Sequence, residues 1–183
     1  MKKIILTAAA IFAFGLVNAQ EAKFGVKAGL NLSNLTGDIE NNSIKAGFQV
    51  GALVDIKISD NFSIQPEVLY SMQGAKFDDG KIELSYINVP VMAKFYVANG
   101  FSLEAGPQIG FLMSAKAKED GAGSEDIKDF LKSTDFGLNI GAGYDLTENF
   151  NLGVRYGFGL SNIAEEGDDL KNSNIAIAVA YKF

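Results

Sequence analysis

The stretch FNLGVRYGFGL, residues 150–160, alternates along its whole length between an apolar or aromatic side chain and a glycine or polar one. The apolar positions run from Phe150 to Leu160, and Arg155 is the only charged residue among the positions between them. A repeat of two residues places successive side chains on opposite faces of an extended chain. The stretch therefore predicts a β-strand with one apolar face and one glycine-rich polar face.

The same alternation recurs through the rest of the chain, with a longer period superimposed on it. Phe24, Phe62, Phe101 and Phe150 each open a similar segment, at intervals of 38, 39 and 49 residues. Each interval holds two predicted strands, a loop and a tight turn, which is the pattern of a hairpin repeat. The eight predicted strands lie near residues 23–33, 44–57, 62–73, 82–96, 101–114, 134–146, 150–161 and 174–183.

The predicted connections differ in length at the two ends of the strands. The short turns lie at 59–61, 98–100 and 147–149, and the longer, polar and acidic segments at 33–43, 74–81, 115–133 and 162–173. Short turns at one end and long loops at the other are typical of outer-membrane barrels. The sequence thus predicts an all-β fold, an eight-stranded antiparallel up-and-down transmembrane β-barrel. Its short turns and both termini would be periplasmic, and its longer loops external.

The composition of the 183 residues excludes several kinds of chemistry. Cysteine and histidine are both absent, which removes thiol and imidazole groups as nucleophiles, general bases and metal ligands. The formal net charge is −6, which argues against binding to the phosphates of a nucleic acid. We therefore expect a protein of the Gram-negative envelope with no enzyme activity, no catalytic or metal-binding residues, no cofactor and no nucleic-acid partner.

The first nineteen residues have the pattern of a secretory signal peptide. Lys2 and Lys3 precede an uncharged, mostly apolar run of 14 residues, and small side chains follow before Gln20. A helix of 14 residues is about 21 Å long, too short for a hydrocarbon core of about 30 Å. The sequence predicts a signal peptide at 1–19, cleaved before Gln20, and a barrel domain at 20–183.

Two opposite arrangements of the strands fit the alternation. In a soluble barrel the apolar face lines a ligand cavity, whereas in a membrane barrel it contacts lipid. The glycine-rich face carries five basic and five acidic residues, and the centre of the apolar face carries no charge, which favours the membrane arrangement because unpaired buried charge is costly. The ten residues are Lys27, Lys45, Lys94, Arg155, Lys182, Asp55, Glu67, Glu104, Asp135 and Asp145.

Four of these charges are expected to form a network inside the barrel. Glu67 and Arg155 each follow their turn phenylalanine by five residues, so they should lie at similar heights across the lumen. Lys94 and Glu104 fall on adjacent predicted strands at nearby heights. Because the side chains of an eight-stranded barrel can fill it, the network is expected either to plug the lumen or to act as a gate.

Aromatic residues recur at two heights on the predicted lipid-facing side. At a tilt of about 40° each residue rises roughly 2.5 Å along the barrel axis, so the rows lie about 20–25 Å apart, the height of the apolar band. The predicted girdles are Phe24, Phe62, Phe101 and Phe150 at one height and Tyr70, Phe111 and Phe158 at the other. The final Tyr181 and Phe183 resemble the C-terminal signal recognised by the barrel-assembly machinery, an expected partner during insertion.

The predicted external loops are rich in acidic residues, at 78–79, 119–120 and 165–169. Carboxylates of this kind bind divalent cations, which would bridge to lipopolysaccharide. In the third loop, Ser124 and the acids after it predict the start of a short helix. Its apolar face would hold Ile127, Phe130 and Leu131 against the barrel rim or a partner.

Three predicted strands contain motifs on which a family resemblance rests. They are IQPEVLYSMQG at 64–74, LSYINVPVMAKFY at 84–96 and EAGPQIG at 104–110. Together they resemble the porin-family outer-membrane β-barrel domain of the PorT-like type, over essentially the whole chain after residue 19. Each motif contains a proline, Pro66, Pro90 or Pro107, and we expect β-bulges there, one of them near Tyr86.

The resemblance implies the fold and the outer-membrane location, with outer-membrane lipid and lipopolysaccharide as surroundings. The leading interpretation is a non-enzymatic barrel with a side-chain-filled lumen and external loops that contact partners. A narrow passive channel for small solutes or ions is the first alternative. A subunit of a secretion or envelope machine, suggested by the PorT-like resemblance, is another, and a soluble lipid-binding barrel is the last.

Overall fold

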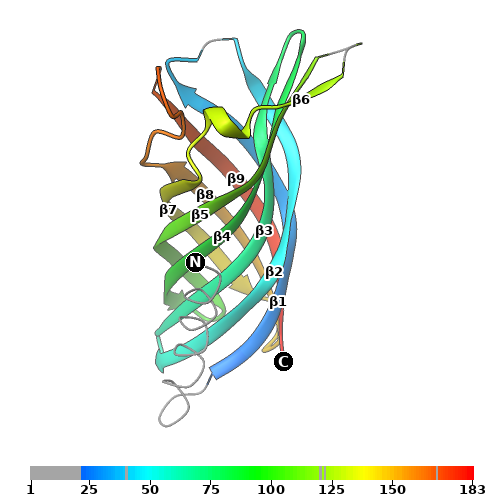
Figure 1. Cartoon of the computed structure of the whole chain (residues 1–183). Coiled ribbons are helices and arrows are strands. Elements are labelled where there is room, and N and C mark those ends of the chain that lie inside the picture. Colours follow the sequence, from blue (N-terminus) through cyan, green and yellow to red (C-terminus); the bar gives the residue numbers. More distant parts are fainter. Residues whose placement is uncertain (1–21, 40, 120, 122, 168) are drawn as a thin grey trace.

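The computed structural model describes residues 22–39, 41–119, 121, 123–167 and 169–183 (Figure 1). The predicted signal peptide and its cleavage before Gln20 lie outside the described residues. No helix among the described residues has the length and hydropathy needed to cross a membrane.

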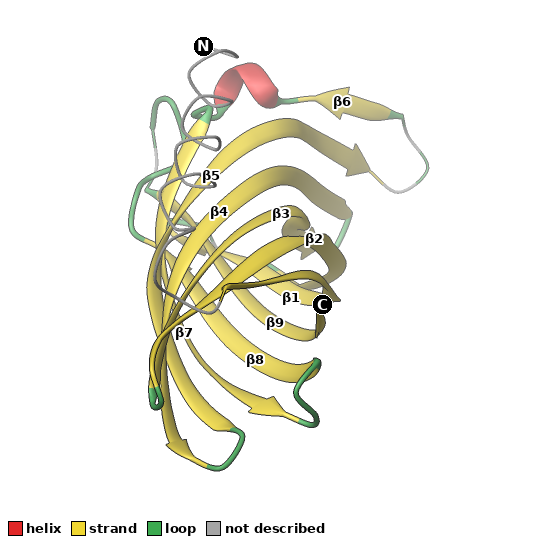
Figure 2. Ribbon diagram, turned by 90° about the horizontal axis from the view of Figure 1, so that it is seen from below, coloured by secondary structure: helices red, strands yellow, loops and turns green. Residues whose placement is uncertain are grey.

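Eight of the strands in the described part of the chain form a closed antiparallel barrel (Figures 1 and 2). Their order around the barrel is β1-β2-β3-β4-β5-β7-β8-β9, and β9 pairs back with β1. The predicted fold is thus confirmed. The strands are β1 (Ala22–Gly37), β2 (Ser43–Ser59), β3 (Phe62–Phe77), β4 (Gly80–Ala98), β5 (Phe101–Glu119), β6 (Ser124–Asp126), β7 (Thr134–Asp145), β8 (Phe150–Gly159) and β9 (Leu170–Lys182).

Apolar side chains point out of the barrel and polar ones point in. On β8, Leu152 and Val154 are 43% and 47% exposed, whereas Arg155 is 7% exposed. The same contrast follows from the two-residue repeat on every strand of the barrel. A soluble barrel with a dry apolar centre is therefore excluded, because the apolar stripes diverge from the axis instead of meeting on it.

Glycines on β7 and β8 make room for the long side chains of the interior. A Cβ atom on Gly141 would lie 2.3 Å from the Val154 carbonyl oxygen and 2.8 Å from Cγ of Arg155. A Cβ atom on Gly143 would lie 2.7 Å from Oε1 of Glu104. These contacts are too short for a real side chain, so the lumen is filled up to the backbone on this side.

The predicted loop at 74–81 is wrong, because the strands continue beyond the apolar band. β3 ends at Phe77 and β4 begins at Gly80, so only Asp78 and Asp79 form the turn. β5 likewise runs to Glu119, into the segment predicted as the third loop. In these extensions the apolar residues Ala75 and Ala115 are buried inward, and this packing stabilises strands whose polar residues suggested a loop.

The helix predicted at 124–131 is also wrong. Ser124 lies in β6, which pairs with the outer part of β5, and only Lys128–Phe130 forms a single 3-10 turn, η1. A helix of eight residues is marginal in water, whereas β5 offers an open edge for pairing. Ile127 and Leu131 pack inward, but Phe130 is 68% exposed, so the three side chains do not share a face.

The prolines lie inside strands without bulges, contrary to the prediction. Pro66, Pro90 and Pro107 each fall where the ladder to the preceding strand skips two pairs while its register stays the same. The missing N–H therefore interrupts the ladder locally without adding a residue. The irregularity predicted near Tyr86 is present, since the register of the β4–β5 ladder shifts between Ser85 and Tyr86.

Candidate functional site

The lumen holds a charge network centred on Arg155, which β8 carries to the middle of the barrel. Its guanidinium donates two hydrogen bonds of 2.8 and 2.9 Å to the Glu67 carboxylate, and Nε donates a third of 2.8 Å to Glu104. Glu67 is 2% exposed and Glu104 is 5% exposed. A bidentate arginine–carboxylate pair is among the strongest charged hydrogen bonds in proteins. The network therefore ties β3, β5 and β8 together across the lumen.

Two lysines complete this network. Nζ of Lys27 lies 3.2 Å from Oε2 of Glu67, and Nζ of Lys94 lies 3.5 Å from Oε1 of Glu104. Gln65 links Lys94 to Glu67, since it accepts a hydrogen bond from Lys94 and donates one to Glu67. The structure thus brings together all four predicted residues, Glu67, Arg155, Lys94 and Glu104.

Sequence reasoning did not assign Lys27 and Gln65 to the network. Lys27 lies only three residues after Phe24, which suggests a lower position than that of Glu67. Neighbouring strands of a tilted barrel are staggered, so residue counts from a turn do not give equal heights around the barrel. Following the pairing from strand to strand gives the relative height correctly. Lys27 pairs with Gly51, and Gly51 pairs with Leu69, which is two residues from Glu67 on the same face of β3.

A second level of charges lies at the end of the barrel that holds the short turns. Nζ of Lys182 lies 3.1 Å from Oδ2 of Asp55 and 3.4 Å from Oδ1 of Asp145. A hollow of about 540 Å³ opens there, lined by these three residues, Tyr96 and Glu148 among others. The charges of the two levels cancel. The network has three cations and two carboxylates, and this mouth has one cation and two carboxylates.

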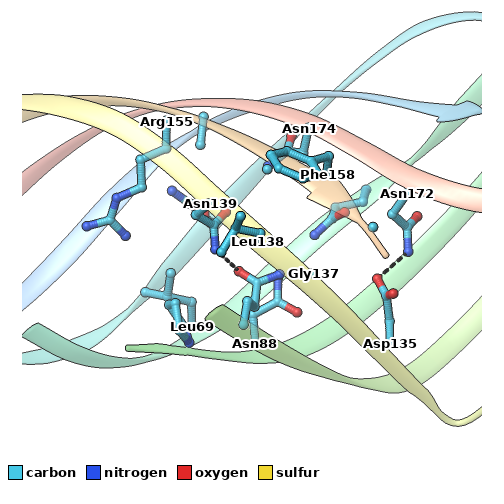
Figure 3. A pocket seen from close by; sticks show the side chains of 17 residues that line it. Leu69, Asn88, Asp135, Gly137, Leu138, Asn139, Arg155, Phe158, Asn172 and Asn174 are labelled. Atoms are coloured by element: carbon cyan, nitrogen blue, oxygen red, sulfur yellow. Dashed lines mark hydrogen bonds between the residues drawn. The ribbon is translucent and has the colours of Figure 1, made fainter. Parts of the chain in front are cut away.

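Amide and hydroxyl side chains fill the lumen beyond the charge network. Nδ2 of Asn172 donates to Oδ2 of Asp135 at 2.9 Å and to the Tyr86 hydroxyl at 3.1 Å. Asn139 donates to Gln108 at 3.2 Å. Figure 3 shows Asp135, Asn139 and Asn172 around a cavity of about 30 Å³, which is room for about one water molecule. The interior is therefore packed at this height too.

An apolar cluster lies at the end of the barrel that holds the long loops, and we call it the cap. It draws side chains from four barrel strands and from two loop segments, one after η1 and one after β8. A hydrogen bond of 2.8 Å from Lys132 N to the Ile163 carbonyl and a β-bridge between Leu131 and Ala164 join these two segments. The cap consists of Leu35, Ala75, Leu84, Tyr86, Leu112, Ala115, Leu131 and Ile163.

The predicted girdle and signal residues lie on the outer surface or close to it. Seven were predicted as girdle residues: Phe24, Phe101, Phe150 and Tyr70 are exposed, and Phe62, Phe111 and Phe158 are half-buried. Tyr181 packs edge-on against Phe150, with ring centroids 4.9 Å apart, and against Phe183 at 5.3 Å. Exposed rings that sequence reasoning left out are Phe48, Phe95, Phe136, Tyr144 and Tyr156. The roles of these residues in lipid and in assembly stay predictions.

The acidic residues of the external loops do not gather. Among the described residues, no group of three or more acidic side chains is placed to hold a metal ion. The predicted bridging of divalent cations by these loops therefore stays a prediction.

Comparisons with known proteins fit this geometry. A family model described as "Outer membrane protein beta-barrel domain" matches residues 18–165. A search of curated proteins gave no match. Among solved structures, the Neisserial surface protein A is similar at a TM-score of 0.62 and 14% identity, with 89% of this chain and 99% of that chain covered. Ail, the attachment invasion locus protein of Yersinia pestis, has a TM-score of 0.56, 18% identity and the same coverage.

Proposed function

The chain belongs to the outer membrane protein beta-barrel domain family, and we propose that it is a non-enzymatic barrel with a closed lumen whose external end contacts other envelope components. The outer membrane is the location of this family. The proposal concerns what the barrel does there. It rests on how the interior is filled and on what the external rim exposes.

The proposal is supported by side chains that fill the lumen at two separate levels, which we take as its two closures. Arg155 spans the interior to Glu67 and Glu104, and the cap packs at the end that holds the long loops. Between them the cavity has a volume of only about 30 Å³. A passage for solutes would require both closures to open. Opening the first would separate the buried carboxylates of Glu67 and Glu104 from Arg155, at a high cost in free energy.

Planar-bilayer recording tests this closure. We expect purified, folded protein to give no discrete conductance steps at concentrations where a general diffusion porin, used as the positive control, gives many. Regular steps from the pure protein would contradict the closed lumen and support the narrow passive channel. Incorporation would be verified by recovering folded protein from the bilayer lipid, so that silence is not mistaken for failed insertion.

The external end offers a surface for a protein partner. Phe130 on η1 is 68% exposed although it lies beside Leu131, which is buried in the cap. Aromatic side chains are enriched at the centres of protein interfaces. Together with the PorT-like motifs, this supports a role as a subunit of a secretion or envelope machine.

A photocrosslinking amino acid at position 130, introduced in intact cells, tests the partner. We expect a covalent adduct with one protein of the cell envelope, identified by mass spectrometry and also co-purified in mild detergent. Position 152 is the control, because Leu152 points to lipid from the barrel wall. Adducts from position 130 with lipid only would contradict a protein partner there.

A further inference from the structure

Lysines dominate the outer surface of β3, β4 and β5 just beyond their apolar band. On these strands every outward side chain from the short turns up to Met72, Ser85 and Met113 is uncharged. The next outward positions, apart from Gly74 and Ser114, form what we call the lysine patch. The lysine patch consists of Lys76, Lys81, Glu83, Lys116 and Lys118.

The neighbours of these lysines fix their direction. Ala75, Leu84 and Ala115 precede or follow patch residues and are buried in the cap. Successive side chains of a strand point to opposite faces, so the patch residues point out of the barrel. Lys76 and Lys116 are exposed, and the side chains of Lys81 and Lys118 are 42% and 39% exposed.

The strand register brings the lysines into direct opposition. Lys81 on β4 pairs with Lys76 on β3 and with Lys118 on β5. Like charges that face each other across a ladder destabilise it. Glu83 compensates in part, since its carboxylate lies 3.3 Å from Nζ of Lys81 and 2.8 Å from Nζ of Lys118.

The carboxylates near the patch leave it with an excess of positive charge. Asp126 on β6 faces Lys116, and its Oδ1 accepts a hydrogen bond from the backbone N–H of Lys128. Glu119 and Glu125 alternate with Lys118 and Asp126 along their strands, so their side chains point to the other face. On the patch face four lysines thus share Glu83 and Asp126, in a chain whose net charge is −6. Asp78 and Asp79 lie farther out, at the tip of the β3–β4 turn. An anion at the patch would relieve the repulsion between the paired lysines.

We propose that the lysine patch binds the phosphate groups of a glycolipid of the outer leaflet, of the lipid A type. The patch begins where the apolar band ends, which is the height of lipid headgroups. Lysine ammonium groups bind phosphate as point charges, and their aliphatic stems lie well against lipid. On the opposite wall the outer charge of β9, Lys171, is already paired with Asp169 at 2.6 Å.

This inference extends the proposed function to a lipid ligand and does not depend on whether the lumen is closed. The test compares Lys81→Gln/Lys118→Gln with Lys57→Gln/Lys171→Gln, which removes two lysines of exposed ion pairs elsewhere on the barrel. Both double variants change the net charge equally. Binding of bis-phosphorylated lipid A to the folded full-length protein in detergent micelles is measured by native mass spectrometry.

We expect the patch variant to bind lipid A about tenfold more weakly than the control variant, which should match the wild type. Lys81→Arg/Lys118→Arg should retain binding, which separates lost charge from misfolding. Dephosphorylated lipid A should bind wild type as weakly as the patch variant binds lipid A, and millimolar inorganic phosphate should not displace the lipid. Equal binding by the patch and control variants, no preference for the phosphorylated lipid, or displacement by phosphate alone would overturn the proposal. A conducting barrel that still shows the expected lipid preference would refute only the closed lumen.

Discussion

The two proposed closures of the barrel interior use opposite chemistry. The charge network of Arg155, Glu67 and Glu104 lies at membrane height, where the outer surface of the strands is apolar. The cap lies where the outer surface of β3, β4 and β5 has become the lysine patch. The same strands are therefore apolar outside and polar inside within the bilayer, and the reverse beyond it. In each segment the apolar side chains lie on the face that is away from water, and the polar side chains lie on the other face.

The two closures also differ in the interactions that stabilise them. The cap gains free energy from removing apolar surface from water, and many side chains share that gain. The charge network depends on complete pairing, because each buried charge is costly without its partner. Removing one side chain should therefore cost more in the network than in the cap.

Among the variants that test this comparison, Arg155→Leu should lower the stability of the folded barrel most. It leaves the buried Glu67 and Glu104 without their main partner, and we expect the free energy of unfolding to fall by about 3–5 kcal/mol. Urea unfolding in lipid vesicles, followed by tryptic protection or by the gel shift of folded barrels, measures the loss. Arg155→Lys keeps the positive charge without the bidentate pair, and it should lose less. A loss below about 0.5 kcal/mol would show that the network is not a structural plug.

Leu84→Ala should have the next largest effect, because Leu84 is 1% exposed in the cap. Loss of a buried leucine and the cavity that follows should lower the free energy of unfolding by about 2–4 kcal/mol. Phe130→Ala is the matched control, since that ring is exposed at the same end and should cost under about 0.5 kcal/mol. If both variants unfold at the same urea concentration, the cap contributes little to stability.

Lys182→Gln should have the smallest effect, about 1 kcal/mol. Its carboxylate partners line an open mouth, and the side chains of Asp55 and Asp145 are 9% and 20% exposed, against 0% and 2% for Glu67 and Glu104. Solvent therefore screens these pairs more than the network. The loss should shrink further in 1 M salt, whereas that of Arg155→Leu should not. The same urea titration with and without salt measures this, and an equal salt dependence of both variants would contradict the difference in burial.

The sequence predicted those parts of the molecule in which apolar and polar residues alternate without interruption. Alternation predicted the eight strands, and the balanced inward charges indicated which face lines the lumen. The strand extensions were missed because Lys76, Lys81 and Lys116 made the segments look like solvated loops, although Ala75 and Ala115 beside them are buried. The place of β6 was missed because the edge that it occupies exists only once β5 outlasts β7.

The prolines have a mechanical consequence for the barrel wall. Pro66 pairs with Val91, beside Pro90, and Pro90 pairs with Gln108, beside Pro107, so the three interruptions follow an oblique line across adjacent strands. Along that line fewer amide groups join neighbouring strands than elsewhere in the wall. The barrel wall should therefore resist bending less in one direction than in others. The bend that costs least free energy is one about an axis parallel to that line.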